Sequence, residues 1–271
     1  MRRKTIGRRA FLKHTAGAAL GTLGLPLFIP ARAMGASGNT PPSERVTMAS
    51  IGCGGMGTNN LRAFLAQPDV QVLAVCDVVT ASDEYGHWYK QGWNGAWFGR
   101  EPAKKIVEAD YAQKNPSGSY KGCDACVDFR EIIARSDIDA VCITTPDHWH
   151  AIPAVMAIYC EKPLCLTVAE GRAMVEAARR YNRVFQTGTQ RRSSEPYRFI
   201  CELIRNGRIG KFQRALVAIG ANNKQAPPAD WKPMPVPEWL DYEMWLGPAP
   251  WAPYHKDRCL YTFRFGQDYS G

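Results

Sequence analysis

A glycine-rich turn, Gly52-x-Gly54-x-x-Gly57, follows an apolar stretch at residues 46–51 and precedes a helical pattern at residues 58–67. In this context Gly52 permits a tight turn, Gly54 lets a pyrophosphate approach the backbone, and Gly57 lets the helix pack close to the strand. Free amide groups and the positive dipole at the start of the helix would attract phosphates. The spacing therefore predicts dinucleotide binding, with a glycine-rich turn that binds no ligand as the alternative. The cofactor-binding residues predicted in this turn are Gly52, Cys53, Gly54, Met56 and Gly57.

Asp77 lies twenty residues beyond the last glycine, directly after an apolar stretch at residues 70–76. A carboxylate at the end of the second strand of such a fold accepts hydrogen bonds from the ribose hydroxyls of the adenosine half. That carboxylate disfavours a 2′-phosphate. The sequence therefore predicts NAD as the cofactor and keeps NADP as the alternative.

A polar loop at residues 144–150, Thr-Thr-Pro-Asp-His-Trp-His, follows a third apolar stretch at residues 139–144. Loops that leave the carboxyl ends of parallel strands line the ligand crevice, so we expect this loop to line the cofactor. An acid–base pair and capping of the following helix are the alternatives. The two-residue spacing of the histidines and the nearby proline argue against a metal site, and none is predicted. The cofactor-lining residues predicted in this loop are Thr145, Pro146, His148 and His150.

These motifs are separated by helical patterns, as in a parallel sheet that helices cover on both faces. One helical pattern spans residues 101–114, and a capping-box pattern at residues 128–131 opens another. Residues 80–100 are rich in aromatic residues and glycine and indicate an irregular insertion. The sequence therefore predicts an α/β fold, a Rossmann-type doubly wound parallel sheet, over residues 46–163.

Residues 164–271 have a different pattern, in which strands and helices no longer alternate at regular spacing. Eight of the nineteen prolines lie at residues 227–253, which predicts a long irregular connection. The regular elements predicted before it are helices at residues 167–181 and 196–205 and strands at residues 184–187 and 212–219.

Glu161-Lys162-Pro163 completes an ordered set of motifs, GCGGMG, VCDV, TTPDHWH and CEKPL. In that order they resemble the Gfo/Idh/MocA family of sugar and cyclitol oxidoreductases, as do the later stretches QTGTQRRS, IRNGRIGKF, LDYEMWLGPAP and DYSG. The resemblance spans about residues 46–271. It implies that the Rossmann domain is followed, over residues 164–271, by a partial substrate-binding domain of α+β type with an incomplete, open mixed sheet.

The resemblance also implies roles for single residues. Lys162 would contact the substrate and assist proton transfer at the reacting hydroxyl, and Glu161 would lie near the nicotinamide ribose. Gln190 and Arg192 match family positions near the cofactor. A surface lysine before a proline is the alternative for Lys162. Since a nearby positive nicotinamide ring disfavours an ammonium group, a lysine at that place suits acid–base work.

The implied reaction is hydride transfer from a hydroxyl-bearing carbon of a sugar, polyol or cyclitol to NAD(P). Two other functions stay open: a glycosidase that uses bound NAD transiently, and a non-catalytic nucleotide-binding module. A homo-oligomer also stays open. Release of an aglycone without net NADH would distinguish the glycosidase.

Two departures from the family pattern concern activity. Residues 151–160 are short for the crossover between two parallel strands, which usually takes a dozen or more residues. The phrase at residues 268–271 precedes, in the family, a segment that carries a catalytic aspartate and histidine. We therefore expect this chain to bind a dinucleotide and to turn over its substrate poorly or not at all.

The N-terminus has the layout of an export signal. Residues 1–33 contain a basic region with Arg8-Arg9, then a mostly apolar run, then Ala-Arg-Ala, which resembles a twin-arginine signal peptide. A membrane anchor is the alternative, and residues 34–45 read as a linker. Because that export route carries folded proteins, we expect a periplasmic or otherwise extracytoplasmic protein that interacts with the twin-arginine machinery and holds its cofactor tightly.

The signal also accounts for most of the net charge of +9, since it holds seven basic residues and no acid, and the remainder carries +2. A nucleic-acid partner is therefore not expected. The nine cysteines do not have the spacing of a disulfide framework. Cys123 and Cys126 form the one close pair, without a second pair at zinc-ligand spacing, and we expect them in a loop.

Overall fold

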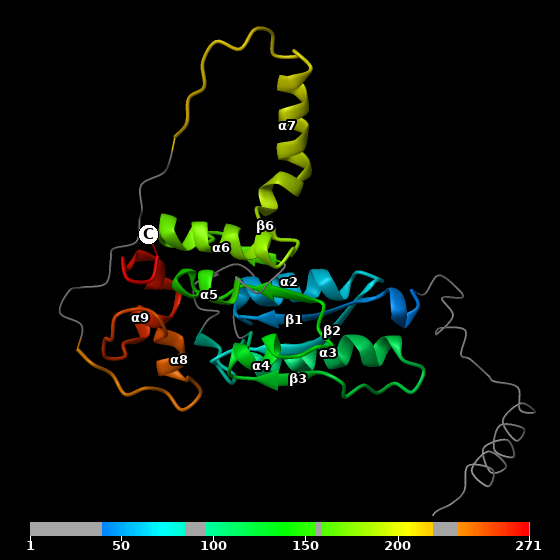
Figure 1. Cartoon of the computed structure of the whole chain (residues 1–271), viewed down its shortest axis with the longest axis vertical. Helices are drawn as coiled ribbons and strands as arrows, with labels where there is room; N and C mark the ends of the chain where they lie inside the picture. The colour runs from blue at the N-terminus through cyan, green and yellow to red at the C-terminus, as the bar shows by residue number, and fades with distance from the viewer. Residues whose placement is uncertain (1–39, 85–95, 155–158, 219–231, 271) are drawn as a thin grey trace, which may run out of the picture. The chain divides into compact units, whose positions relative to one another are not determined.

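A six-stranded sheet in the order β3-β2-β1-β4-β5-β6 forms the centre of the fold, and all its neighbouring strands pair in parallel (Figure 1). The computed structural model describes residues 40–84, 96–154, 159–218 and 232–270. The chain divides into two units, residues 1–44 and 45–271, and the sheet belongs to the second. The predicted signal peptide lies outside the described residues. The strands are β1 Val46–Ile51, β2 Val70–Cys76, β3 Asp124–Cys126, β4 Ala140–Ile143, β5 Tyr159–Glu161 and β6 Gln186–Gly188.

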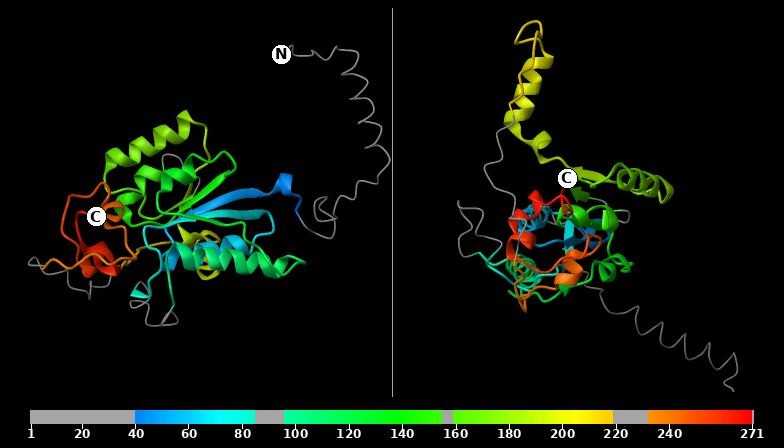
Figure 2. Two further views of the ribbon diagram at one scale, coloured as in Figure 1. Left: turned by 90° about the horizontal axis from the view of Figure 1, so that it is seen from below. Right: turned by 90° about the vertical axis from the view of Figure 1, so that its left-hand side faces the viewer.

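Helices cover both faces of this sheet (Figure 2). On one face Leu61 and Val107, from α2 and α3, pack against the strands. On the other face Ile132 and Met174, from α4 and α6, do the same together with α5. The predicted doubly wound α/β fold is confirmed. The helices are α2 Gly55–Leu65, α3 Arg100–Lys114, α4 Phe129–Ile133, α5 Ala151–Ala154, α6 Val168–Arg180, α7 Glu195–Arg205, α8 Tyr242–Leu246 and α9 Lys256–Cys259.

The short crossover between β4 and β5 keeps the parallel register. Cys142 pairs with Tyr159 and Ile143 pairs with Cys160. Helix α5 contributes four residues to this crossover, and residues 155–158 lie outside the described part of the chain. A crossover of reduced length therefore still delivers β5, and the residues that follow it, to the carboxyl edge of the sheet.

Three sequence-based expectations need correction. The boundary predicted after residue 163 falls inside the sheet, because β6 pairs with β5 in parallel. The strand predicted at residues 212–219 is absent over residues 212–218, where Leu216 and Val217 are 81% and 84% exposed. A strand needs a neighbour for its backbone hydrogen bonds, and among the described residues no strand pairs with this segment. Of the cysteine pair expected in a loop, Cys126 lies in β3, whereas Cys123 directly precedes this strand and is buried.

The proline-rich region contributes a third apolar cluster rather than a loose connection. Leu240, Trp245 and Tyr254 pack with Val79, three residues beyond the end of β2. An isolated antiparallel bridge joins Val79 to Leu240. The part of the predicted irregular connection from residue 239 onward is thereby built into the Rossmann domain. Within the described residues, no helix is both long and apolar enough to cross a membrane.

Candidate dinucleotide-binding site

The glycine-rich turn is built so that side chains do not fit at two of its positions. A Cβ on Gly52, whose φ is +88°, would lie 2.5 Å from the carbonyl group of Thr144. A Cβ on Gly57 would lie 1.9 Å from the Gly52 carbonyl oxygen. The turn delivers the backbone of Gly54 and Met56 to the start of α2, at the edge of a cavity. The predicted roles of Gly52 and Gly57 therefore have a steric basis.

Asp77 lines the same cavity and has a second task that the sequence did not reveal. One of its carboxylate oxygens accepts from the amide of Cys53 at 2.5 Å, and the other from the amide of Val79 at 2.8 Å. Burial raises the pKa of Asp77 above its usual value, and the two amides and Arg100 oppose that shift. The side chain of Cys53 is buried in the core behind the turn. Asp77 therefore fixes the turn and also faces the predicted ribose position.

The polar loop after β4 is held by its two histidines. His150 is buried, and its Nε2 donates to the Thr145 carbonyl at 2.8 Å while its Nδ1 contacts the Pro163 carbonyl. His148 Nε2 donates to the Trp245 carbonyl at 2.9 Å. Burial lowers the pKa of His148. Thr145, Pro146 and His150 line the cavity, whereas His148 lies behind the loop and fixes its position.

Glu161 is buried at the end of β5 and receives three donors on one oxygen. Its Oε1 accepts from Asn60 Nδ2 at 3.0 Å, Tyr159 Oη at 3.0 Å and Gln190 Nε2 at 2.6 Å. The pattern of motifs did not point to Asn60 or Tyr159, since neither belongs to one. The three donors fix the carboxylate and link α2, β5 and the segment after β6.

Lys162, Gln190 and Arg192 have different positions. Lys162 is exposed and lines the cavity directly after Glu161. Gln190 contacts both Glu161 and, at 3.9 Å, the Met56 sulfur, so it joins the glycine turn to the end of β5. Arg192 is exposed, and the contact found for it is a backbone hydrogen bond to Thr189. The structure thus brings the first two to the site, and the role of Arg192 stays a prediction.

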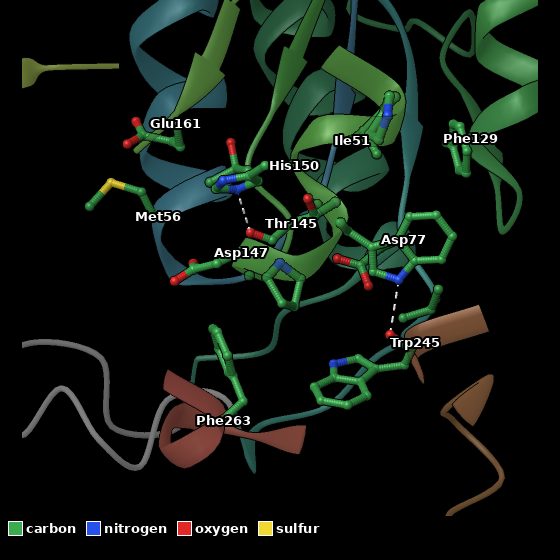
Figure 3. Close-up of a pocket in the computed structure, with 18 of the residues that line it drawn as sticks. Ile51, Met56, Asp77, Phe129, Thr145, Asp147, His150, Glu161, Trp245 and Phe263 are labelled. Carbon is green, nitrogen blue, oxygen red and sulfur yellow. Dashed lines mark hydrogen bonds between the residues drawn. The ribbon is translucent and has the colours of Figure 1, made fainter. Parts of the chain in front are cut away.

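The cavity has a volume of about 410 Å³ and lies between the carboxyl ends of the strands and the C-terminal segment. Figure 3 shows Trp245 and Phe263 on the side opposite His150 and Glu161. Sequence reasoning missed this wall because its aromatic residues lie in a region without periodicity. No group of three potential metal ligands occurs among the described residues. The glycine-rich turn, the start of α2 and the Asp77 carboxylate fit a dinucleotide.

Two family models match the chain. Residues 99–189 match the one described as "Oxidoreductase family, NAD-binding Rossmann fold", and residues 219–271 match "Oxidoreductase family, C-terminal alpha/beta domain". Together they span just over half of the chain. Both belong to the Gfo/Idh/MocA family.

Curated relatives are similar over part of their length. A 2,7-anhydro-N-acetylneuraminate hydratase of Mediterraneibacter gnavus is 27% identical over 52% of this chain and 41% of its own. An α-N-acetylgalactosaminidase of Shewanella oneidensis is 28% identical over 65% of this chain and 37% of its own. An inositol 2-dehydrogenase of Salmonella paratyphi B is 29% identical over 59% of this chain and 42% of its own. The chain spans about two fifths of the length of these relatives.

A solved structure of scyllo-inositol dehydrogenase from Lactobacillus casei, with NAD(H) and scyllo-inositol bound, is 22% identical and covers 61% of this chain and 42% of that one, with a TM-score of 0.45. The two family models match the chain in the order in which the Rossmann domain and the later segments occur in it. The chain therefore belongs to the Gfo/Idh/MocA oxidoreductase family and contains its NAD-binding Rossmann fold.

Proposed function

We propose that the protein is an NAD-dependent oxidoreductase that acts on a hydroxyl group of a sugar, polyol or cyclitol. The observation that carries this proposal is the convergence of three separate loops on one cavity. The glycine turn after β1, Asp77 after β2 and Lys162 after β5 all line it. The inositol dehydrogenase among the relatives supports a cyclitol or sugar as the substrate class.

Each group at the cavity has a task in this proposal. The start of α2 and the glycine turn bind the pyrophosphate, and Asp77 accepts from the adenosine ribose. Lys162 Nζ holds and returns the proton of the substrate hydroxyl, while Glu161 fixes the backbone before it. When bound, NAD supplies the acceptor for the hydride of the carbinol carbon. The aromatic wall of Trp245 and Phe263 excludes water from that side of the cavity.

The test combines binding with turnover. The purified protein is titrated with NADH, and NADH formation from NAD is followed with inositols and sugars. Because turnover by this chain is expected to be poor, NADH binding is the first readout. In Lys162→Met we expect NADH binding to persist and whatever hydride transfer the unaltered chain has to fall by about 10²–10⁴-fold, because the proton acceptor is lost. Lys211→Met, at an exposed position, is the matched control.

Two other results would replace this proposal. Aglycone release from an N-acetylgalactosaminide without net NADH would make the protein a glycosidase, as the α-N-acetylgalactosaminidase relative suggests. NADH binding with neither reaction would leave a nucleotide-binding module. Failure to bind NADH would contradict the site itself.

We also propose that the protein is exported by the twin-arginine machinery with its cofactor tightly held. The support is the Arg8-Arg9 pair and the apolar run that follows it, which lie outside the described residues. Changing both arginines to lysine should retain the precursor inside the cell, whereas the same change at Arg2 and Arg3 should not. Protein purified without added cofactor should contain nucleotide, and its absence would contradict tight binding.

A further inference from the structure

The segment from Trp239 to Gly247, which we name the clamp, connects two loops that the sheet keeps apart. It binds the loop after β2 through its backbone. Thr80 N donates to the Trp239 carbonyl at 2.8 Å, and Asp241 N donates to the Val78 carbonyl at 3.0 Å. These hydrogen bonds lie within three residues of Asp77.

The same segment binds the loop after β4 through one carbonyl group. The Trp245 oxygen accepts from His148 Nε2 and from Trp149 Nε1, each at 2.9 Å. Trp245 is 1% exposed, and its ring makes an edge contact with His148 at 5.1 Å. Because His148 and Trp149 are adjacent in the chain, their two hydrogen bonds to the Trp245 carbonyl fix the position of the loop after β4.

Gly247 places the backbone of the clamp close to Trp149 of that loop. Its φ is +49°, and a Cβ there would lie 2.0 Å from Cζ2 of Trp149. The Trp149 ring also contacts Phe129 of α4, with the ring centroids 5.4 Å apart. Trp149 is therefore held between the clamp and α4, and any side chain at residue 247 would displace it.

The strand order gives these contacts a functional meaning. Since β1 lies between β2 and β4, the loops after β2 and β4 flank the glycine turn. A dinucleotide crosses such a sheet at this switch point, with the adenosine half toward β2 and the nicotinamide half toward β4. We propose that the clamp, through Trp245 and Gly247, positions residues 144–150 for the nicotinamide half of the cofactor. This inference rests on the NAD site of the proposed function.

The test measures the two halves of the cofactor separately. The affinity for NADH depends on the contacts of both halves of the cofactor, whereas the affinity for ADP-ribose depends on the adenosine half. In Gly247→Ala the displaced Trp149 moves the loop, so we expect NADH affinity to fall by about tenfold or more while ADP-ribose affinity changes less than about twofold. Gly118→Ala is the matched control, because Gly118 has a φ of +67° and no atom within 4 Å of its Cβ position.

A second variant covers the case in which Gly247→Ala does not fold. His148→Phe removes one donor to the Trp245 carbonyl at a buried residue that does not line the cavity. We expect this variant to lower the affinity for NADH by about fivefold, the equivalent of one hydrogen bond, and to leave the affinity for ADP-ribose unchanged. Equal losses for both ligands, or no loss for either, would overturn the inference. If the unaltered protein binds neither ligand, the NAD site fails instead.

Discussion

Gln190 Nε2 donates to Glu161 Oε1 at 2.6 Å and thereby joins the segment after β6 to the end of β5. Asn60 and Tyr159 donate to the same oxygen at 3.0 Å. One carboxylate oxygen thus gathers donors from three elements. Because Lys162 directly follows Glu161, the backbone that presents the proposed proton carrier is fixed by these three hydrogen bonds.

Gln190→Ala should therefore loosen the site. Loss of a hydrogen bond to a buried carboxylate costs about 1.5–3 kcal/mol of unfolding free energy, and we expect the low end because Gln190 is exposed. Affinity for NADH should fall several-fold. Thermal unfolding and NADH titration measure both effects. Gln186→Ala is the control, since the amide of Gln186 bonds locally to the Thr187 carbonyl. Equal behaviour of the two variants would contradict a role for Gln190.

Gly57→Ala should damage the turn more severely. The new Cβ would lie 1.9 Å from the Gly52 carbonyl oxygen, a backbone atom that moves only with the whole turn. We expect a loss of more than about 2 kcal/mol in unfolding free energy and no measurable dinucleotide binding. Denaturant unfolding and NADH titration measure these losses.

Gly171→Ala is the matched control for that change. Gly171 lies in α6, and the neighbour of its Cβ position is the Cys165 sulfur at 3.1 Å, the end of a side chain. Alanine is favoured over glycine in a helix by up to about 1 kcal/mol, so the denaturant midpoint of this variant should be at least as high as that of the unaltered protein. If Gly57→Ala has the same denaturant midpoint and the same NADH affinity as Gly171→Ala, the turn does not pack as closely at Gly57 as described.

Asp77→Asn tests the second task of that carboxylate. Both carboxylate oxygens accept from backbone amides, whereas asparagine has one acceptor and would direct an NH₂ group at either Cys53 N or Val79 N. We expect a loss of about 1–3 kcal/mol in stability, and weaker binding of NADH and ADP-ribose together. Asp83→Asn, in the same loop and exposed, should change neither. A variant that loses discrimination against NADPH but keeps full stability would assign Asp77 to the ribose alone.

Local patterns were sufficient to predict β1, β2 and β4, the helices α2, α3, α6 and α7, and the glycine turn. The helix predicted at residues 167–181, for example, is α6, and a capping box of Thr167 and Glu170 forms at its start. Such features depend on residues a few positions apart. The glycine pattern likewise places its own binding groups, because the strand and the helix around it are adjacent in the chain.

The rest of the site depends on contacts between distant residues. His148 and Trp245 are 97 positions apart, and no periodicity in the aromatic, proline-rich stretch indicates that its backbone would bind the loop after β4. The strand predicted around Leu216 failed because the prediction used local preference alone. The local preference of the apolar residues there is for β structure, but a strand forms only where a partner satisfies its backbone.

The burial of His148 makes part of the folding stability depend on pH. Burial is the largest effect on this group and lowers its pKa below 6.5, although the Trp245 carbonyl and the Asp147 carboxylate oppose that shift and His150 adds to it. The folded state therefore binds a proton at this site less readily than the unfolded chain does. This contribution to stability is complete above about pH 6.5 and is lost as the pH falls below it toward the folded-state pKa.

His148→Phe keeps a ring at this position and removes the titration. The Tm of the unaltered protein should drop between about pH 7.5 and pH 5, and the Tm of the variant should drop by less over the same interval. At the higher pH the variant should itself be less stable than the unaltered protein, because the Trp245 carbonyl loses the His148 donor and keeps only Trp149. Parallel drops in both proteins would show that His148 does not titrate from a buried, neutral state, and would assign the acid sensitivity to other groups.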